Sequence, residues 1–188
     1  MSAPTRVAGW GRVPDGSVVT WTVAEGRRGR RWREVVARDG ATVHGLLLET
    51  DPDGRFSHLE LARADGLWTF HPEPDGTLHG NHVRPGEPGV RHVAGWPFAA
   101  DDAVIVEGSA VGLAAVAWRW LATVREGATI DVAGVVIAVD GGLAQRPAIR
   151  LERLSPTRWL VGGWAAFDVD DAGLPILDGG STGPLELG

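Results

Sequence analysis

The chain has 188 residues, of which 44% are hydrophobic, and this length suits one domain with a sizeable core. It contains no Cys, which excludes a disulfide framework, a thiolate zinc site and a Cys nucleophile. The net charge of −6 argues against a general nucleic-acid binder, although all 18 basic residues are Arg and residues 1–38 are locally basic. No apolar run approaches the roughly 20 residues of a membrane helix, and no signal peptide is recognisable, so we expect a cytoplasmic protein without a membrane span.

The first predicted strands follow an approach segment, residues 1–17. Ser17–Ala24 and Trp32–Arg38 are rich in β-branched and aromatic residues, which favour strands. The loop between them carries Arg27, Arg28, Arg30 and Arg31. These arginines are either solvated charges that discourage strand addition at a sheet edge, or an anion patch beside Trp21 and Trp32.

The stretch 41–83 organises the chain. Four runs, 41–49, 55–63, 67–72 and 77–83, are separated by the turn sequences Asp51-Pro52-Asp53-Gly54, Asp65-Gly66 and Pro74-Asp75-Gly76. Gly adopts positive φ freely, and Asp tolerates tight turns because its side chain bonds the nearby backbone. The pattern predicts an antiparallel meander.

Turn chemistry sets the predicted register of this meander. Pro52 and Pro74 lack an N–H, so each fits the first position of a three-residue loop, and the second loop pairs Glu73 with Thr77 and His71 with His79. A two-residue loop at Asp65-Gly66 pairs Ala64 with Leu67 and places Glu60 opposite His71.

The register divides the meander into two faces. The polar face holds His44, His58, Glu60, Thr69, His71, His79 and Asn81, and the apolar face holds Leu47, Leu59, Leu61, Trp68 and Phe70. His58, Glu60, His71 and His79 could supply a general acid and base near neutral pH, or could lie on an ordinary solvated face. We assign neither a catalytic residue nor a metal site, because a solvated outer face explains these polar side chains more simply.

Residues 84–100 are rich in Pro and Gly and predict a long connection, followed by a short strand at 104–107. A helix is predicted over about 109–123, with Ser109 as N-cap and a nearly all-apolar surface. Such a helix should be buried with the sheet curled around it, although a strand interpretation of the same run stays open. Ser109 has a second interpretation as a nucleophile between glycines.

Further strands are predicted at 129–140, 148–154, 159–169 and 174–177. This spacing favours a single mainly β domain, residues 1–188, in which an antiparallel meander forms a barrel or half-barrel around one helix, over a βαβ architecture. Asp168, Asp170 and Asp171 resemble calcium ligands but fit a hairpin turn better.

The segment Trp159–Leu185 resembles the C-terminal end of the glycolipid-binding family of small bacterial proteins. Similar features occur in the same order along the chain: Asp65-Gly66-Leu67-Trp68, Leu78-His79-Gly80, and an Ala-rich segment with Trp118. The family's Asn stretch with paired Arg and its late Tyr residues are missing here. The resemblance implies an antiparallel sheet curled into a half-barrel around short helices.

Three functions are compatible with these features. The leading hypothesis is binding of a lipophilic small molecule or glycolipid in a cavity between sheet and helix, without a cofactor, with walls formed by Leu59, Leu61, Trp68, Phe70, Trp118 and Trp120. The second is a cofactor-free isomerase, cyclase or hydrolase with its histidines in the barrel lumen. The third is a structural or interaction protein with a filled core. The sequence leaves the oligomeric state open.

Overall fold

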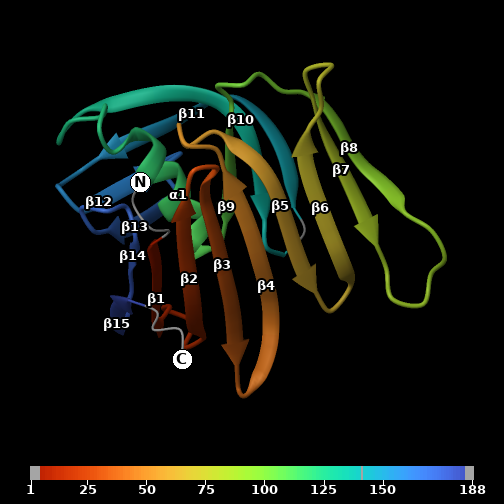
Figure 1. Ribbon diagram of the computed structural model, residues 1–188, viewed down its shortest axis with the longest axis horizontal. Coiled ribbons are helices and arrows are strands. Elements are labelled where there is room, and N and C mark those ends of the chain that lie inside the picture. The colour runs from red at the N-terminus through yellow and green to blue at the C-terminus, as the bar shows by residue number, and fades with distance from the viewer. Residues whose placement is uncertain (1–4, 141, 185–188) are drawn as a thin grey trace.

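The computed structural model describes residues 5–140 and 142–184 and is mainly β, with a single α-helix in these ranges. One sheet has nine strands and the other has six (Figure 1). The elements in chain order are β1 Thr5–Arg12, β2 Val18–Gly26, β3 Gly29–Arg38, β4 Ala41–Thr50, β5 Phe56–Arg63, β6 Gly66–Pro72, β7 Thr77–Val83, β8 Arg91–Pro97, β9 Ala103–Glu107, α1 Ala110–Trp120, β10 Thr129–Ala138, β11 Leu143–Arg153, β12 Arg158–Val161, β13 Ala165–Val169, β14 Pro175–Ile176 and β15 Asp178–Pro184.

The nine-stranded sheet is an antiparallel meander in which β1 to β8 lie in chain order. The C-terminal strand β15 lies beside β1 at one edge. The predicted meander is therefore confirmed, and it extends further than expected. The approach segment contains β1, and the Pro- and Gly-rich connection contains β8.

The six-stranded sheet runs in the order β14-β13-β12-β11-β10-β9. Its strands are antiparallel except that β9 and β10 are parallel, and α1 makes the crossover between them. The segment β9-α1-β10 is thus one βαβ unit within a sheet that is otherwise antiparallel, as predicted. Because β9 is covered on both faces, Ala103–Val106 are all buried.

The helix forms where the sequence predicts it. Ser109 has extended backbone dihedrals, and its hydroxyl accepts a hydrogen bond from the Gly112 N–H at 2.9 Å, as an N-cap does. Val111 to Ala117 are all buried. The six-stranded sheet curls as a half-barrel behind α1, and the nine-stranded sheet lies in front of it (Figure 1). The helix and half-barrel prediction is confirmed, and the strand alternative is wrong.

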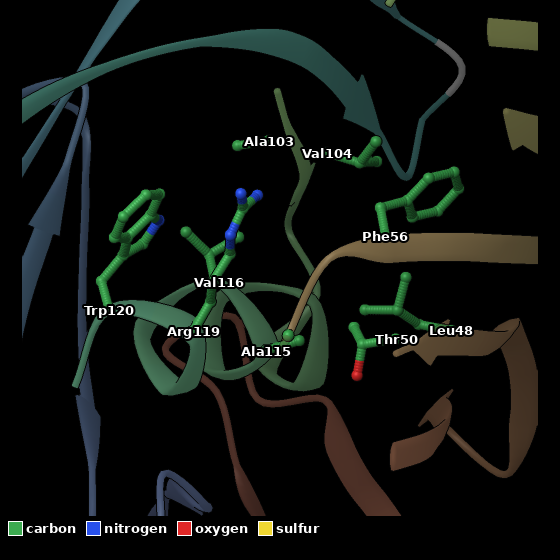
Figure 2. Close-up of a pocket in the computed structure, with 10 residues that line it drawn as sticks. Leu48, Thr50, Phe56, Ala103, Val104, Ala115, Val116, Arg119 and Trp120 are labelled. Atoms are coloured by element: carbon green, nitrogen blue, oxygen red, sulfur yellow. The ribbon is translucent and has the colours of Figure 1, made fainter. Parts of the chain in front are cut away.

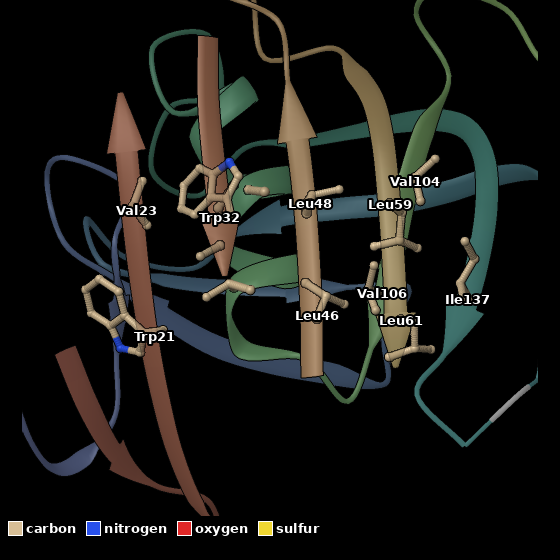
Figure 3. Packing of buried hydrophobic residues seen from close by; sticks show 14 of the residues in the cluster. Trp21, Val23, Trp32, Leu46, Leu48, Leu59, Leu61, Val104, Val106 and Ile137 are labelled. Atoms are coloured by element: carbon tan, nitrogen blue, oxygen red, sulfur yellow. The ribbon is translucent and has the colours of Figure 1, made fainter. Parts of the chain in front are cut away.

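The inner face of the nine-stranded sheet supplies much of the core. One row crosses neighbouring strands as Val23, Trp32, Leu48, Leu59 and Phe70, all almost fully buried. Figure 3 shows the central part of this row facing side chains of β9 and β10, including Val104, Val106 and Ile137. Alternation along each strand puts the next residue on the outer face.

The predicted three-residue loops are confirmed. The N–H of Asp51 donates to the carbonyl of Arg55, and the N–H of Glu73 donates to the carbonyl of Thr77, both at 2.8 Å. His71 pairs with His79 as predicted.

A β-bulge corrects the predicted faces of β4. The register shifts between Glu49 and Thr50, so that Leu48 pairs with Leu59 and Leu47 pairs with Glu60. One extra residue in a strand moves every later side chain to the opposite face. Leu47 therefore lies on the outer face and His44 on the inner one, which reverses the prediction for both.

The tight turn before β6 also differs from its prediction. Arg63 pairs with Gly66, so the turn residues are Ala64 and Asp65. Gly66 has φ 135°, and a Cβ there would lie 2.1 Å from the Val83 carbonyl oxygen. The glycine thus permits a close backbone approach. Glu60 consequently lies opposite Thr69 rather than His71, although the two faces are unchanged.

Candidate functional site

Side chains fill the space between the nine-stranded sheet and α1. The predicted wall residues Leu59, Leu61 and Phe70 are at most 1% exposed and belong to the packed core. The cavity that remains beside α1 has a volume of about 20 Å³, room for about one water molecule. Figure 2 shows Val116 and Arg119 rising from α1 toward Ala103 across this crevice. Its other lining residues are Leu48, Thr50, Gly54, Phe56, Val104, Ala115 and Trp120.

The three predicted tryptophans are half-buried and occupy three different places. Trp68 stacks on the ring of His82, with centroids 4.1 Å apart. Trp118 lies under the guanidinium of Arg30 at 4.2 Å, and Trp120 borders the crevice. The sequence predicted one wall from Trp118 and Trp120, but only Trp120 reaches the crevice.

Arg119 at the crevice is already paired. Its guanidinium lies 3.2 Å from a carboxylate oxygen of Asp101 and covers the ring of Trp120. Burial lowers the pKa of Arg119, against the opposing effect of Asp101. The guanidinium of Arg119 is thus held against Trp120 in the crevice lining and is already neutralised by Asp101.

The four arginines of the predicted anion patch are separated. Arg27 and Arg28 form the turn between β2 and β3. Arg30 is buried, bonds the carboxylate of Glu25 at 2.9 Å and donates to the carbonyl of Ala172 at 2.7 Å. Burial lowers its pKa in spite of Glu25. Arg31 lies on the opposite face of β3, so the structure does not gather these four side chains.

The predicted histidine and glutamate cluster lies on the outer face. His58 Nε2 is 3.1 Å from Glu60 Oε1, and these side chains are 30% and 43% exposed. The ring of His71 lies 5.3 Å from that of His79 between centroids, and its Nε2 is 2.9 Å from Glu73 Oε1. The lumen position proposed for these histidines is therefore wrong. In the described residues, no three His, Asp or Glu side chains form a metal site.

A buried glutamate and histidine were not predicted as a pair. Glu34 Oε1 lies 3.1 Å from His44 Nε2, and Glu34 Oε2 accepts a hydrogen bond from the Val111 N–H at 3.1 Å. Both side chains are at most 4% exposed. Glu34 thus joins β3 and β4 to the first turn of α1, where the helix dipole favours a carboxylate. Glu34 shares the alternating positions of Trp32 and Val36 on β3, which places its side chain on the same buried face as theirs. This pattern in the sequence could have identified Glu34 as a buried residue.

An apolar row crosses the outer face of the nine-stranded sheet, and sequence reasoning missed it. Cross-strand pairs link Trp10, Thr20, Val35, Gly45, Ala62, Leu67 and Val83 in order across β1 to β7. Its large members Trp10, Val35, Leu67 and Val83 are 37–45% exposed. Exposed large apolar side chains that share one face of a sheet are candidates for an interaction surface.

Three hollows adjoin this row on the outer face. One of about 360 Å³ is lined by Ala8, Thr20, Thr22, Arg33 and Val35 among others. One of about 240 Å³ lies over Val35, Gly45, Leu47, Ala62 and Leu67. The third, of about 300 Å³, is lined by Arg6, Thr22, Val23, Ala24, Arg31 and Arg33. Arg33 lines all three, so the hollows form one surface, which we call the outer groove.

The other motifs have structural roles. Ser109 is fully buried and caps the helix. Asp170 Oδ1 accepts hydrogen bonds from the N–H groups of Ala172 and Leu174, as a turn residue does. Among the described residues, no helix is long and apolar enough to cross a bilayer.

No protein family and no curated protein matches the chain. Among solved structures, the chain is similar to a DUF1089 family protein from Pseudomonas aeruginosa. The two share 14% sequence identity over 93% of this chain and 89% of the other, with a TM-score of 0.47. A likeness this distant carries no argument about function.

Proposed function

We propose that the protein binds a lipophilic small molecule, and that the ligand lies in the outer groove. The core is filled, whereas the outer face combines an exposed apolar row with hollows of about 240 and 360 Å³. Small-ligand sites typically measure about 300–1,000 Å³ and have mostly apolar walls.

Gly45 is the observation that carries this proposal. It lies within β4 without a positive φ, and a Cβ built on it would meet only the Glu34 carbonyl oxygen at 3.9 Å. Glycine inside a strand costs roughly 0.5–1 kcal/mol relative to alanine, and it often marks a close approach by a ligand. The fold has room for a side chain here, so the absence of one keeps the floor of the hollow open.

Dodecyl maltoside, a neutral amphiphile with a sugar headgroup, is a suitable probe and also represents the glycolipid class. We expect the protein to bind it below its micelle concentration, with a change in tryptophan fluorescence from Trp10. Leu67→Ser should weaken binding about thirtyfold, because a leucine buried by the ligand contributes about 2 kcal/mol. Gly45→Val should fill the hollow and weaken binding at least as much.

Leu154→Ser is the matched control, because Leu154 is 43% exposed against 37% for Leu67 and follows β11 in the other sheet. It should leave the affinity unchanged. Native mass spectrometry of freshly purified protein should show a carried-over lipophilic molecule that Gly45→Val lacks. Equal loss in Leu67→Ser and Leu154→Ser, or no binding by the wild type, would contradict the proposal.

A further inference from the structure

The third hollow of the outer groove is chemically different from the other two. Arg6, Arg31 and Arg33 surround it, and Thr22 and Ala24 on β2 form its floor. Arg6 and Arg31 both pair with Ala24, from opposite sides, and Arg33 pairs with Thr22. Three guanidinium groups therefore converge over two neighbouring cross-strand rows of a protein whose net charge is −6.

Two of these three arginines have no acidic partner among the residues that the structure describes. The Nε of Arg31 donates a hydrogen bond to Oε1 of Glu49 at 2.6 Å, so Arg31 already has a carboxylate partner. No hydrogen bond or ion pair joins Arg6 or Arg33 to another residue in the part of the chain that the structure describes. Elsewhere on the surface, Arg55, Arg63 and Arg158 each pair with an Asp. Arg6 and Arg33 therefore both line the hollow without an acidic partner among the described residues.

We propose that this hollow holds the anionic headgroup, of the phosphate class, of the ligand whose apolar part lies over Gly45. The inference rests on the proposed function and adds the chemistry of the headgroup. Strands lie about 4.8 Å apart, so Arg6 on β1 and Arg33 on β3 approach an anion above β2 from its two sides. The guanidinium fork matches the oxygens of a phosphate bidentately.

Arg33 connects the two parts of the ligand. It lines the charged hollow and both apolar hollows, so a headgroup held by Arg33 has its attached chain at the entrance to the apolar row. The Thr22 side chain, which lines the charged hollow and the 360 Å³ hollow, adds a hydroxyl donor at the same boundary. An amphipathic molecule therefore fits the groove in one orientation.

Dodecyl phosphate and dodecyl maltoside share an alkyl chain and differ in headgroup charge, so their comparison tests the inference. At low salt, dodecyl phosphate should bind at least tenfold more tightly, because hydrogen bonds between charged groups are the strong ones. Arg6→Gln should remove most of this advantage and leave dodecyl maltoside binding unchanged within twofold, because Arg6 lines only the charged hollow. Arg33→Gln should weaken the binding of dodecyl phosphate more than that of dodecyl maltoside, because Arg33 lines the apolar hollows as well. Arg146→Gln, which changes the net charge equally at an exposed position of β11 in the other sheet, should alter neither affinity.

Glu49→Gln provides a test in the opposite direction. It frees Arg31 from its carboxylate partner, so dodecyl phosphate should bind severalfold more tightly while dodecyl maltoside does not. A variant that only perturbed the fold would weaken both ligands.

The outcomes separate the two proposals. Equal binding of the two amphiphiles, unaffected by Arg33→Gln, would overturn the headgroup site and leave the lipophilic site standing. Binding of inorganic phosphate as tight as that of dodecyl phosphate, lost in Arg33→Gln, would retain the anion site and overturn the amphipathic ligand. Binding of none of the three probes would overturn both.

Discussion

The two faces of the nine-stranded sheet carry the same kind of contact in opposite surroundings. On the inner face, Glu34 and His44 lie 3.1 Å apart and are buried, and on the outer face Glu60 and His58 lie at the same distance in contact with solvent. The inner carboxylate also bonds the helix backbone. Burial, rather than distance, distinguishes the inner pair, which holds the core together, from the outer pair, which contacts solvent.

Removal of the inner carboxylate should have the largest effect. Glu34→Ala leaves His44 and the Val111 N–H without their partner in the core, and we expect it to lower the free energy of unfolding by about 3–5 kcal/mol. Urea unfolding followed by tryptophan fluorescence measures this loss. Glu60→Ala on the outer face should cost less than about 1 kcal/mol. Equal losses of stability in the two variants would mean that burial does not distinguish the two carboxylates.

Adjacent leucines of β4 sharpen the comparison. Leu48→Ala should cost about 2–5 kcal/mol because it opens a cavity in the core, whereas Leu47→Ala should cost less than about 1 kcal/mol because its side chain is on the outer face. The same unfolding measurement checks both. A larger loss for Leu47→Ala would restore the register expected without the bulge.

The turn between β5 and β6 should show a smaller effect that depends on pH. Burial acts to raise the pKa of Asp65, but hydrogen bonds and charge from Arg63, with His82 nearby, outweigh it and lower this pKa below its usual value. A lowered pKa stabilises the fold above the unfolded value of about 3.9 and loses that contribution as pH falls through the folded value.

Asp65→Asn should therefore be less stable than the wild type at pH 7, by under about 1 kcal/mol because the carboxylate is 42% exposed. The difference between the two proteins should shrink as the pH falls below about 4. Thermal unfolding of both between pH 3 and pH 7 measures this trend. A difference that is constant with pH would show that the charge of Asp65 does not contribute.

The sequence predicted the meander because its turns have local chemistry. Pro52, Pro74 and the glycines that follow them set loop length, and the three-residue loops form as expected. The cap at Ser109 likewise needs only neighbouring residues. Contacts between residues close in sequence were thus within reach of sequence reasoning.

The candidate site could not be predicted in the same way. The bulge between β4 and β5, in which Ser57 is the extra residue opposite Glu49 and Thr50, depends on how these two strands fit together, and it decides that Leu47 faces solvent and His44 does not. The outer row joins Trp10 to Val83 through five other strands, and each of its residues looks ordinary in its own strand. Gly45 resembles any strand glycine until the space around it is known.

The pairing of β15 with β1 has a consequence for biosynthesis. β1 binds both β2, its neighbour in the chain, and β15, in which Pro184 pairs with Val7. Hairpins from β2 to β7 can form while the chain is still being translated, but β1 keeps one unpaired edge until residues 178–184 leave the ribosome. The edge of the sheet next to the charged hollow is therefore completed last, and a nascent chain exposes it to pairing with other strands.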